Sequence, residues 1–64
     1  MAHIEAQFFA KRFEDEEFNE KMITALTEAV ASVLGEAAGK DTTIILHSIE
    51  PERWGFGGMQ LSKR

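Results

Sequence analysis

Thr42-Thr43-Ile44-Ile45-Leu46-His47-Ser48-Ile49 is the stretch that decides the fold of this chain of 64 residues. It is rich in β-branched residues, which favour strands. In a strand, Ile44 and Leu46 would point to one face, while Ile45 and Ile49 would point to the other. A strand that is apolar on both faces is typical of parallel pairing. The stretch therefore predicts a strand that pairs in parallel with a second strand of the chain.

A parallel partner requires a crossover connection, and a helix is predicted ahead of this strand. Apolar residues recur every three or four positions up to Leu34, which is the pattern of an amphipathic helix. The stripe consists of Phe18, Met22, Leu26, Val30 and Val33 or Leu34, widened by Ile23 and Ala29. It is expected to be core rather than a ligand site. Gly35 is expected just past the helix end, and residues 35–41 are expected to form a connector.

Four consecutive acids, Glu14-Asp15-Glu16-Glu17, precede the apolar stripe. They are interpreted as the first turn of the helix, where carboxylates complement the positive end of the helix dipole and Asp15 can cap it. The alternative is a cation site, and the helix start is favoured.

His3 to Phe9 predicts the first strand, which completes a βαβ unit. Its two faces alternate, with Ala2, Ile4, Ala6 and Phe8 on one and His3, Glu5, Gln7 and Phe9 on the other. Residues 10–13 would leave the sheet. After the second strand, Pro51 ends the pairing, and Gly55, Gly57 and Gly58 allow a tight reversal into a hairpin. The predicted class is α/β, as a single domain over residues 1–64.

The small size of the chain predicts oligomerisation. A domain this short buries only about 60% of its unfolded surface, and the chain has no Cys for a disulfide or a Cys-based zinc site. His3 and His47 have no metal-ligand spacing, so neither a metal nor a cofactor is expected. A lone βαβ unit also leaves one sheet face and both edges open. Two copies would form a four-stranded sheet, so a dimer at least is expected.

Composition also argues against several other classes of protein. The net charge of −4 disfavours nucleic-acid binding, which needs a basic patch. No apolar run approaches the roughly 18 residues of a membrane span. The first residues lack the pattern of a signal peptide. The sequence therefore predicts a soluble cytoplasmic protein that binds neither nucleic acid nor membrane.

Two motifs at opposite ends of the chain carry a resemblance to a known family. One runs from Met1-Ala2-His3-Ile4-Glu5 to Arg12, and the other is Glu50-Pro51-Glu52-Arg53-Trp54-Gly55-Phe56-Gly57-Gly58. With a single helix between them, they resemble the short members of the 4-oxalocrotonate tautomerase family over essentially the whole chain. The resemblance implies a homo-hexamer built as a trimer of dimers. It also implies a 1,3-proton shift in small unsaturated 2-keto or 2-hydroxy acids.

The resemblance assigns roles to individual residues. Ala2 stands where the family has the proline whose amine is the catalytic base, and Arg12 matches the arginine that binds a substrate carboxylate. A guanidinium suits that role because it grips carboxylates through two parallel hydrogen bonds. Phe9 matches an apolar pocket residue, and Trp54 matches the aromatic residue that keeps the site dry. Thr43 aligns with the second arginine of the family, which is therefore missing.

Each assignment has a structural alternative. Arg12 would otherwise be a surface residue paired with Glu14 or Glu16, and Trp54 would be ordinary interface packing. Arg53 is expected at the surface or in an inter-subunit cation–π contact, with replacement of the missing arginine as the alternative. His3 is interpreted as an interface residue rather than a proton relay. His47 is interpreted as a hydrogen-bonded strand residue.

The sequence predicts a tautomerase-like protein that is inactive or weakly active, because Ala2 replaces the proline. One alternative is an active enzyme that uses the Ala2 amine after Met1 removal. Another is a non-catalytic subunit that partners a proline-bearing paralogue or binds a small acid. An alanine introduced deliberately to remove the base would look the same in the sequence.

Overall fold

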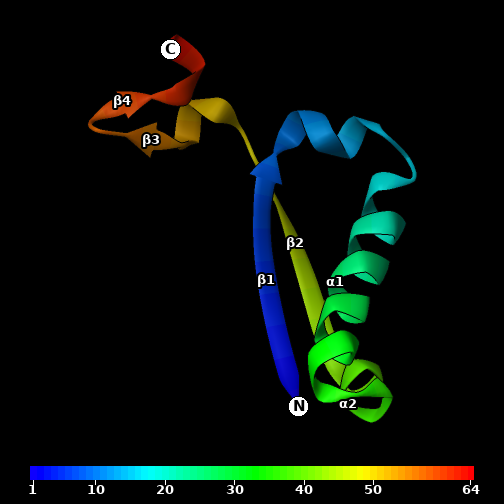
Figure 1. Ribbon diagram of the computed structural model, residues 1–64. Coiled ribbons are helices and arrows are strands. Elements are labelled where there is room, and N and C mark those ends of the chain that lie inside the picture. The colour runs from blue at the N-terminus through cyan, green and yellow to red at the C-terminus, as the bar shows by residue number, and fades with distance from the viewer.

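Two parallel strands and the helix that connects them form the body of the protein. The computed structural model describes residues 1–64, and Figure 1 shows strand β1 (Ala2–Phe9) beside strand β2 (Thr42–Ile49), with helix α1 (Phe18–Leu34) along the sheet. The strands pair in parallel from Ala2 opposite Thr42 to Phe9 opposite Ile49. The predicted βαβ unit is confirmed, and the second strand has the predicted bounds.

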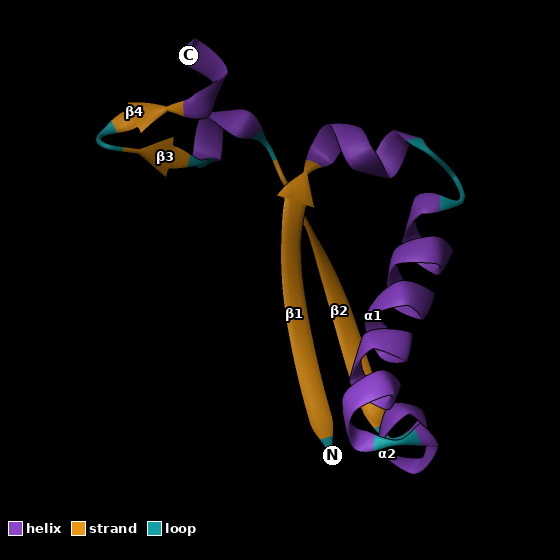
Figure 2. Cartoon of the chain, viewed as in Figure 1, coloured by secondary structure: helices purple, strands orange, loops and turns teal.

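Helix α1 covers one face of the sheet and leaves the other face open (Figure 2). Along β1, residues at even positions are half-buried, whereas His3, Glu5 and Gln7 are exposed. The helix packs through aromatic edges, because the Phe18 ring lies 5.2 Å from that of Phe8 and 5.1 Å from that of Phe13. The first part of the predicted stripe therefore faces the sheet.

The acidic run does not form the first turn of α1, so that prediction is wrong. Residues Ala10–Glu14 form a turn of 3-10 helix, and Asp15 is extended. The Asp15 carboxylate accepts a hydrogen bond from the Glu17 N–H at 2.9 Å. This is an Asx-turn, which aspartate favours. The Asp15 carboxylate is therefore already hydrogen-bonded ahead of the helix and does not cap α1. Helix α1 starts only at Phe18 and has no side-chain cap.

The expected connector contains a short helix, α2 (Glu36–Lys40), which packs on the end of α1. Its Gly39 is the one buried residue of the chain. A Cβ built on Gly39 would lie 2.8 Å from the Ala31 Cβ, so only glycine allows this approach. Gly35 stands between the two helices with φ of 97°, as expected for a residue that ends a helix.

The glycine-rich end forms the predicted hairpin. Strands β3 (Gly55–Phe56) and β4 (Met59–Gln60) are antiparallel and are joined by two residues, Gly57 and Gly58. Both glycines have positive φ, 62° and 87°, as a two-residue hairpin turn requires. The hairpin projects from the carboxyl end of the sheet (Figure 1) and exposes 73% of Phe56.

The chain has no hydrophobic core of its own. None of its hydrophobic side chains is fully buried, and Val33 and Leu34, at the end of the predicted stripe, are 81% and 65% exposed. The body is thin, with overall extents of 43 × 27 × 14 Å. Neither helix is long and apolar enough to cross a membrane.

The close approach of α2 to α1 gives the first testable prediction. Gly39→Ala should lower the free energy of unfolding by about 1 kcal/mol, because overpacking at Ala31 outweighs the gain in helix propensity. Urea unfolding at fixed protein concentration measures the change. The double variant Gly39→Ala with Ala31→Gly should lose less than the sum of the single variants. Strict additivity would contradict the packing described.

Candidate functional site

The carboxyl end of the sheet brings together two of the predicted pocket residues. The rings of Phe9 and Trp54 lie 4.8 Å apart, edge to face, and both residues are half-buried. Trp54 is held there by a 3-10 turn, Pro51–Arg53, because its N–H donates to the Pro51 carbonyl at 3.2 Å. Beside this pair is an open hollow of about 210 Å³, lined by Gln7, Ile49, Arg53 and Trp54. The hollow is small and open, and Ile49 and Trp54 make part of its wall apolar.

Arg12 lies at the same end of the sheet but lines a different hollow. It belongs to the 3-10 turn after β1. The hollow that it lines also contains Phe8, Phe18 and Met22, between that turn and α1. The guanidinium forms no ion pair, so the alternative pairing with Glu14 or Glu16 is not observed. Arg12 is exposed.

Ala2 lies at the opposite end of the sheet. The seven residue steps of β1 from Ala2 to Phe9 correspond to about 23 Å at strand spacing, and Figure 1 shows the N-terminus far from the hairpin. Ala2 borders a hollow with Leu34 and Asp41. The Met1 amine lies 3.5 Å from the Asp41 carboxylate. A single chain therefore does not bring Ala2 to Arg12 and Trp54, and a site that combines them needs residues from another copy.

Thr43 takes part in a hydrogen-bonded cluster on the open face of the sheet. His3 Nδ1 lies 2.7 Å from Thr43 Oγ1, and His3 Nε2 lies 3.0 Å from Glu5 Oε2. His47 Nε2 lies 2.7 Å from Glu5 Oε1, so one carboxylate serves both histidines. These hydrogen bonds, first from His47 and then from His3, hold the pKa of Glu5 below its ordinary value of 4.5. The expectation that His47 is a hydrogen-bonded strand residue is confirmed.

Sequence reasoning treated His3 and His47 as isolated and therefore missed this cluster. The available signal was the alternation of β1, which places His3 and Glu5 on one face. The missing information was the register of the sheet, since Glu5 and His47 are 42 positions apart in the chain. No group of three or more His, Cys, Asp and Glu side chains is arranged to hold a metal ion.

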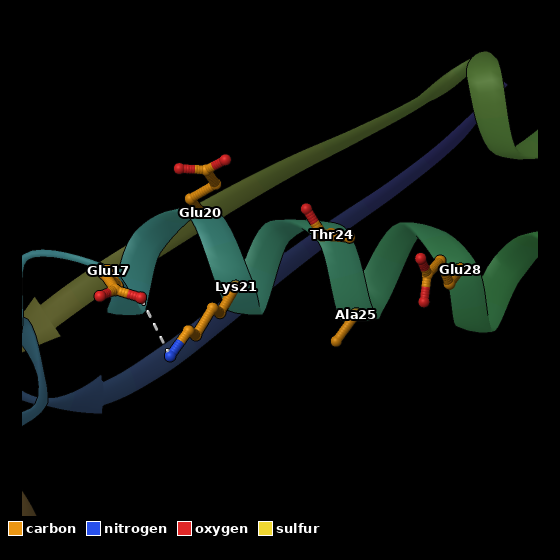
Figure 3. Close-up of a pocket in the computed structure, with 6 residues that line it drawn as sticks. All are labelled: Glu17, Glu20, Lys21, Thr24, Ala25 and Glu28. Atoms are coloured by element: carbon orange, nitrogen blue, oxygen red, sulfur yellow. Dashed lines mark ion pairs between the residues drawn. The ribbon is translucent and has the colours of Figure 1, made fainter.

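The outer surface of α1 is a solvated helix face rather than a site. Figure 3 shows six residues that line a shallow hollow there: Glu17, Glu20, Lys21, Thr24, Ala25 and Glu28. Glu17 and Lys21 form an ion pair of 3.1 Å, but both side chains are 72% exposed. Such an exposed pair contributes little to stability.

These features define a small βαβ protein whose pocket residues are divided between the two ends of its sheet. The tautomerase family, described as "Tautomerase enzyme", matches residues 3–64, and the chain belongs to that family. The fold is also similar to the crystal structure of a 4-oxalocrotonate tautomerase homologue. The TM-score is 0.77 at 23% identity, over 100% of this chain and 97% of that chain. No curated protein sequence matches the chain. The predicted family is confirmed.

The cluster around Glu5 gives a prediction about acid stability. Because the folded-state pKa of Glu5 lies below 4.5, the ionised network stabilises the fold above about pH 4.5. That contribution is lost as the pH falls through the folded-state pKa. Glu5→Gln should therefore be less stable than the wild type near neutral pH, and the difference should shrink at acidic pH.

Urea unfolding at several pH values measures this difference. Glu20→Gln, on the outer face of α1, is the matched control and should show no comparable change with pH. Parallel stability profiles for the wild type and Glu5→Gln would contradict the role assigned to the network.

Proposed function

We propose that this chain is a 4-oxalocrotonate tautomerase-like protein that has lost its proline base. It is inactive or only weakly active in the keto–enol tautomerisation of unsaturated 2-keto and 2-hydroxy acids. The observation that carries this proposal is the residue at the start of β1, which is Ala2. An α-amine there would have an ordinary pKa of about 7.7–8.0 and could serve as a base. An amide nitrogen, which Ala2 has whenever Met1 precedes it, cannot.

The binding half of the site supports the family assignment. Arg12 forms no ion pair within the chain and is free to grip a substrate carboxylate. Phe9 and Trp54 supply an apolar wall of packed rings. Thr43 provides no cation where the family has its second arginine, and its hydroxyl is engaged with His3. A dienolate would therefore be stabilised by one cation instead of two, which further lowers the expected activity.

We also propose that the chain assembles with copies of itself, as a trimer of dimers. The lack of any buried hydrophobic side chain supports an assembly, because a unit without a core is not stable alone. An open groove of about 370 Å³ between β1 and α1 is lined only by apolar residues: Ala2, Ile4, Ala29, Val30, Val33 and Leu34. A second copy that pairs along β1 would cover this groove and extend the sheet to four strands. Contacts between such dimers would bring Ala2 of one copy to Arg12 and Trp54 of another.

Two alternatives follow from the same site. If Met1 is removed, the Ala2 amine takes nearly the position of the family base, and weak tautomerase activity results. With Met1 present, the terminal amine lies about 3.5 Å further along the chain and pairs with Asp41. The second alternative is a non-catalytic subunit that partners a proline-bearing paralogue or binds a small acid. The intact mass and an activity assay of the purified protein distinguish these cases.

Restoring the proline tests the proposed loss of the base. The wild type should show little or no ketonisation of 2-hydroxymuconate or phenylenolpyruvate. Ala2→Pro, with removal of Met1 verified by intact mass, should raise kcat/KM by about 100-fold, because a well-placed base contributes at least that factor. Ala2→Ser retains a primary amine and should give no such gain. Robust turnover by the wild type with Met1 in place would refute the proposal.

The single tryptophan allows a test of the binding role of Arg12. A small unsaturated 2-keto acid should quench Trp54 fluorescence in the assembled protein. Arg12→Ala should weaken this binding by about tenfold or more, since a charged hydrogen bond contributes roughly 1.5–3 kcal/mol. Lys11→Ala, in the same turn, should change it by less than about threefold, because lysine does not offer the bidentate fork of arginine. Equal losses in the two variants would argue against a specific role for Arg12.

A further inference from the structure

The hollow beside Trp54 offers a ligand both a cation and an apolar wall. It is open, has a volume of about 210 Å³ and is lined by Gln7, Ile49, Arg53 and Trp54. Ile49 and Trp54 are apolar, whereas the other two side chains end in an amide and a guanidinium. Ligand sites typically combine apolar walls with a few placed polar groups. The lining of this hollow therefore fits a carboxylate that is attached to an apolar body.

Both polar side chains of the hollow lack partners within the chain. Arg53 takes part in no ion pair. No side-chain hydrogen bond involves its guanidinium or the Gln7 amide. The cation–π contact of the chain is made by Arg64, which lies 5.7 Å from the centre of the Phe56 ring. Arg53 is exposed, and its guanidinium can grip a carboxylate through two parallel hydrogen bonds.

The backbone that carries Arg53 and Trp54 is held in place within the chain. The Arg53 N–H donates to the Glu50 carbonyl at 2.9 Å, and the Leu61 N–H donates to the Trp54 carbonyl at 2.8 Å. The Phe9 ring packs against the indole at 4.8 Å between ring centres. Residues that are already held in position lose less conformational freedom when a ligand binds, which favours binding at this hollow.

The sheet separates this hollow from the one that Arg12 lines. Gln7 and Phe8 are consecutive residues of β1, so their side chains point to opposite faces of the sheet. Gln7 lines the Trp54 hollow, whereas Phe8 lines the Arg12 hollow. The two hollows therefore open toward opposite faces, and a small ligand beside Trp54 does not reach Arg12 of the same chain. The cation that this chain itself supplies beside Trp54 is Arg53.

The rest of the molecule gives an anion no general attraction. The net charge is −4, and the 3-10 turn that carries Arg53 also carries Glu52. A bare anion in this hollow would have only its direct contacts with Arg53 and Gln7. A flat apolar group on the same ligand would add contact area against the indole of Trp54. These surroundings favour an acid with an apolar body over a small inorganic anion.

We propose that Arg53 and Gln7 hold the carboxylate of a small, flat, conjugated or aromatic acid whose apolar body lies against Trp54 and Ile49. Arg53 is then a specificity-determining residue that selects acids with one carboxylate and an apolar body. The inference rests on the proposed function, in which Trp54 is a wall of the substrate site, and it adds a cation and a substrate class. The role of Arg12 is separate, because an Arg12 that reaches this hollow comes from another copy.

Fluorescence titration of Trp54, the single tryptophan, tests the proposal with two unreactive probes. Cinnamate is a flat conjugated acid, and cinnamamide has the same body without the charge. The wild type should bind cinnamate at least about tenfold more tightly than cinnamamide. Arg53→Gln should weaken cinnamate binding by about tenfold or more and change cinnamamide binding by less than about twofold, because only the charged hydrogen bonds are lost.

Three further variants place the contact, with circular dichroism as the check that each is folded. Arg64→Gln makes the same change of charge on the arginine that packs on Phe56, and it should alter cinnamate binding by less than about twofold. Arg53→Lys keeps the charge without the guanidinium fork and should give an intermediate loss. Gln7→Glu nearly preserves shape but adds a like charge, so it should weaken the binding of cinnamate and not that of cinnamamide.

Several results would overturn the proposal. Equal binding of cinnamate and cinnamamide by the wild type would remove the carboxylate contact. Inorganic phosphate that competes as well as cinnamate does would remove the preference for an apolar body. Cinnamate binding that is lost in Arg12→Ala but kept in Arg53→Gln would overturn this inference and leave the proposed function intact. Conversely, cinnamate binding as predicted, with no gain of activity in Ala2→Pro, would support this inference and count against the proposed function alone.

Discussion

The parallel pairing of β1 with β2 is the constraint on which the rest of the structure depends. Its register places Ala2 opposite Thr42 and Phe9 opposite Ile49. It therefore collects the chain's chemically distinctive residues at two ends of one sheet. The amino end holds Ala2 and Thr43, and the carboxyl end holds the aromatic pair of Phe9 and Trp54. The cluster of His3, Glu5 and His47 runs along the face between them. A shift of one residue would turn every side chain of a strand to the opposite face and destroy both arrangements.

This division of the site has a consequence for catalysis. A base at position 2 and a carboxylate-binding Arg12 cannot meet within one chain, because a strand of eight residues separates them. The proposed chemistry would therefore need residues from more than one copy of the chain. Under the proposed function, Ala2 at position 2 leaves the site without its proline base, whereas the residues proposed to bind the substrate are present. In the proposed assembly, different copies would supply the base position and the binding residues.

The open face of the sheet combines a polar cluster with apolar neighbours. Parallel sheets are normally covered on both faces, yet this face is open in the single chain. Its centre is polar, and the Glu5 carboxylate lies within hydrogen-bond distance of both histidines. Apolar neighbours such as Ile45 make the same face suitable for burial.

The sequence by itself determined the elements and the family. The β-branched run of 42–49 gave a strand with the observed bounds, and the two glycines of positive φ gave the hairpin turn, because both signals are local. The helix start was predicted too early. The Asp15 carboxylate accepts a hydrogen bond in a local turn before α1, and a run of acidic residues looks the same in the sequence whether it forms such a turn or caps a helix. The connector was misread because a helix as short as α2 depends on the contact of Gly39 with Ala31.

Only the tertiary structure decided which residues meet. The meeting of Glu5 with His47 across 42 positions depends on the register between two distant strands, whereas the separation of Ala2 from Arg12 follows from the length of β1 alone. Register is set by the length of the crossover and by how α1 packs on the sheet. No periodicity within either strand records it, because each strand's own alternation is the same for every even shift of its partner.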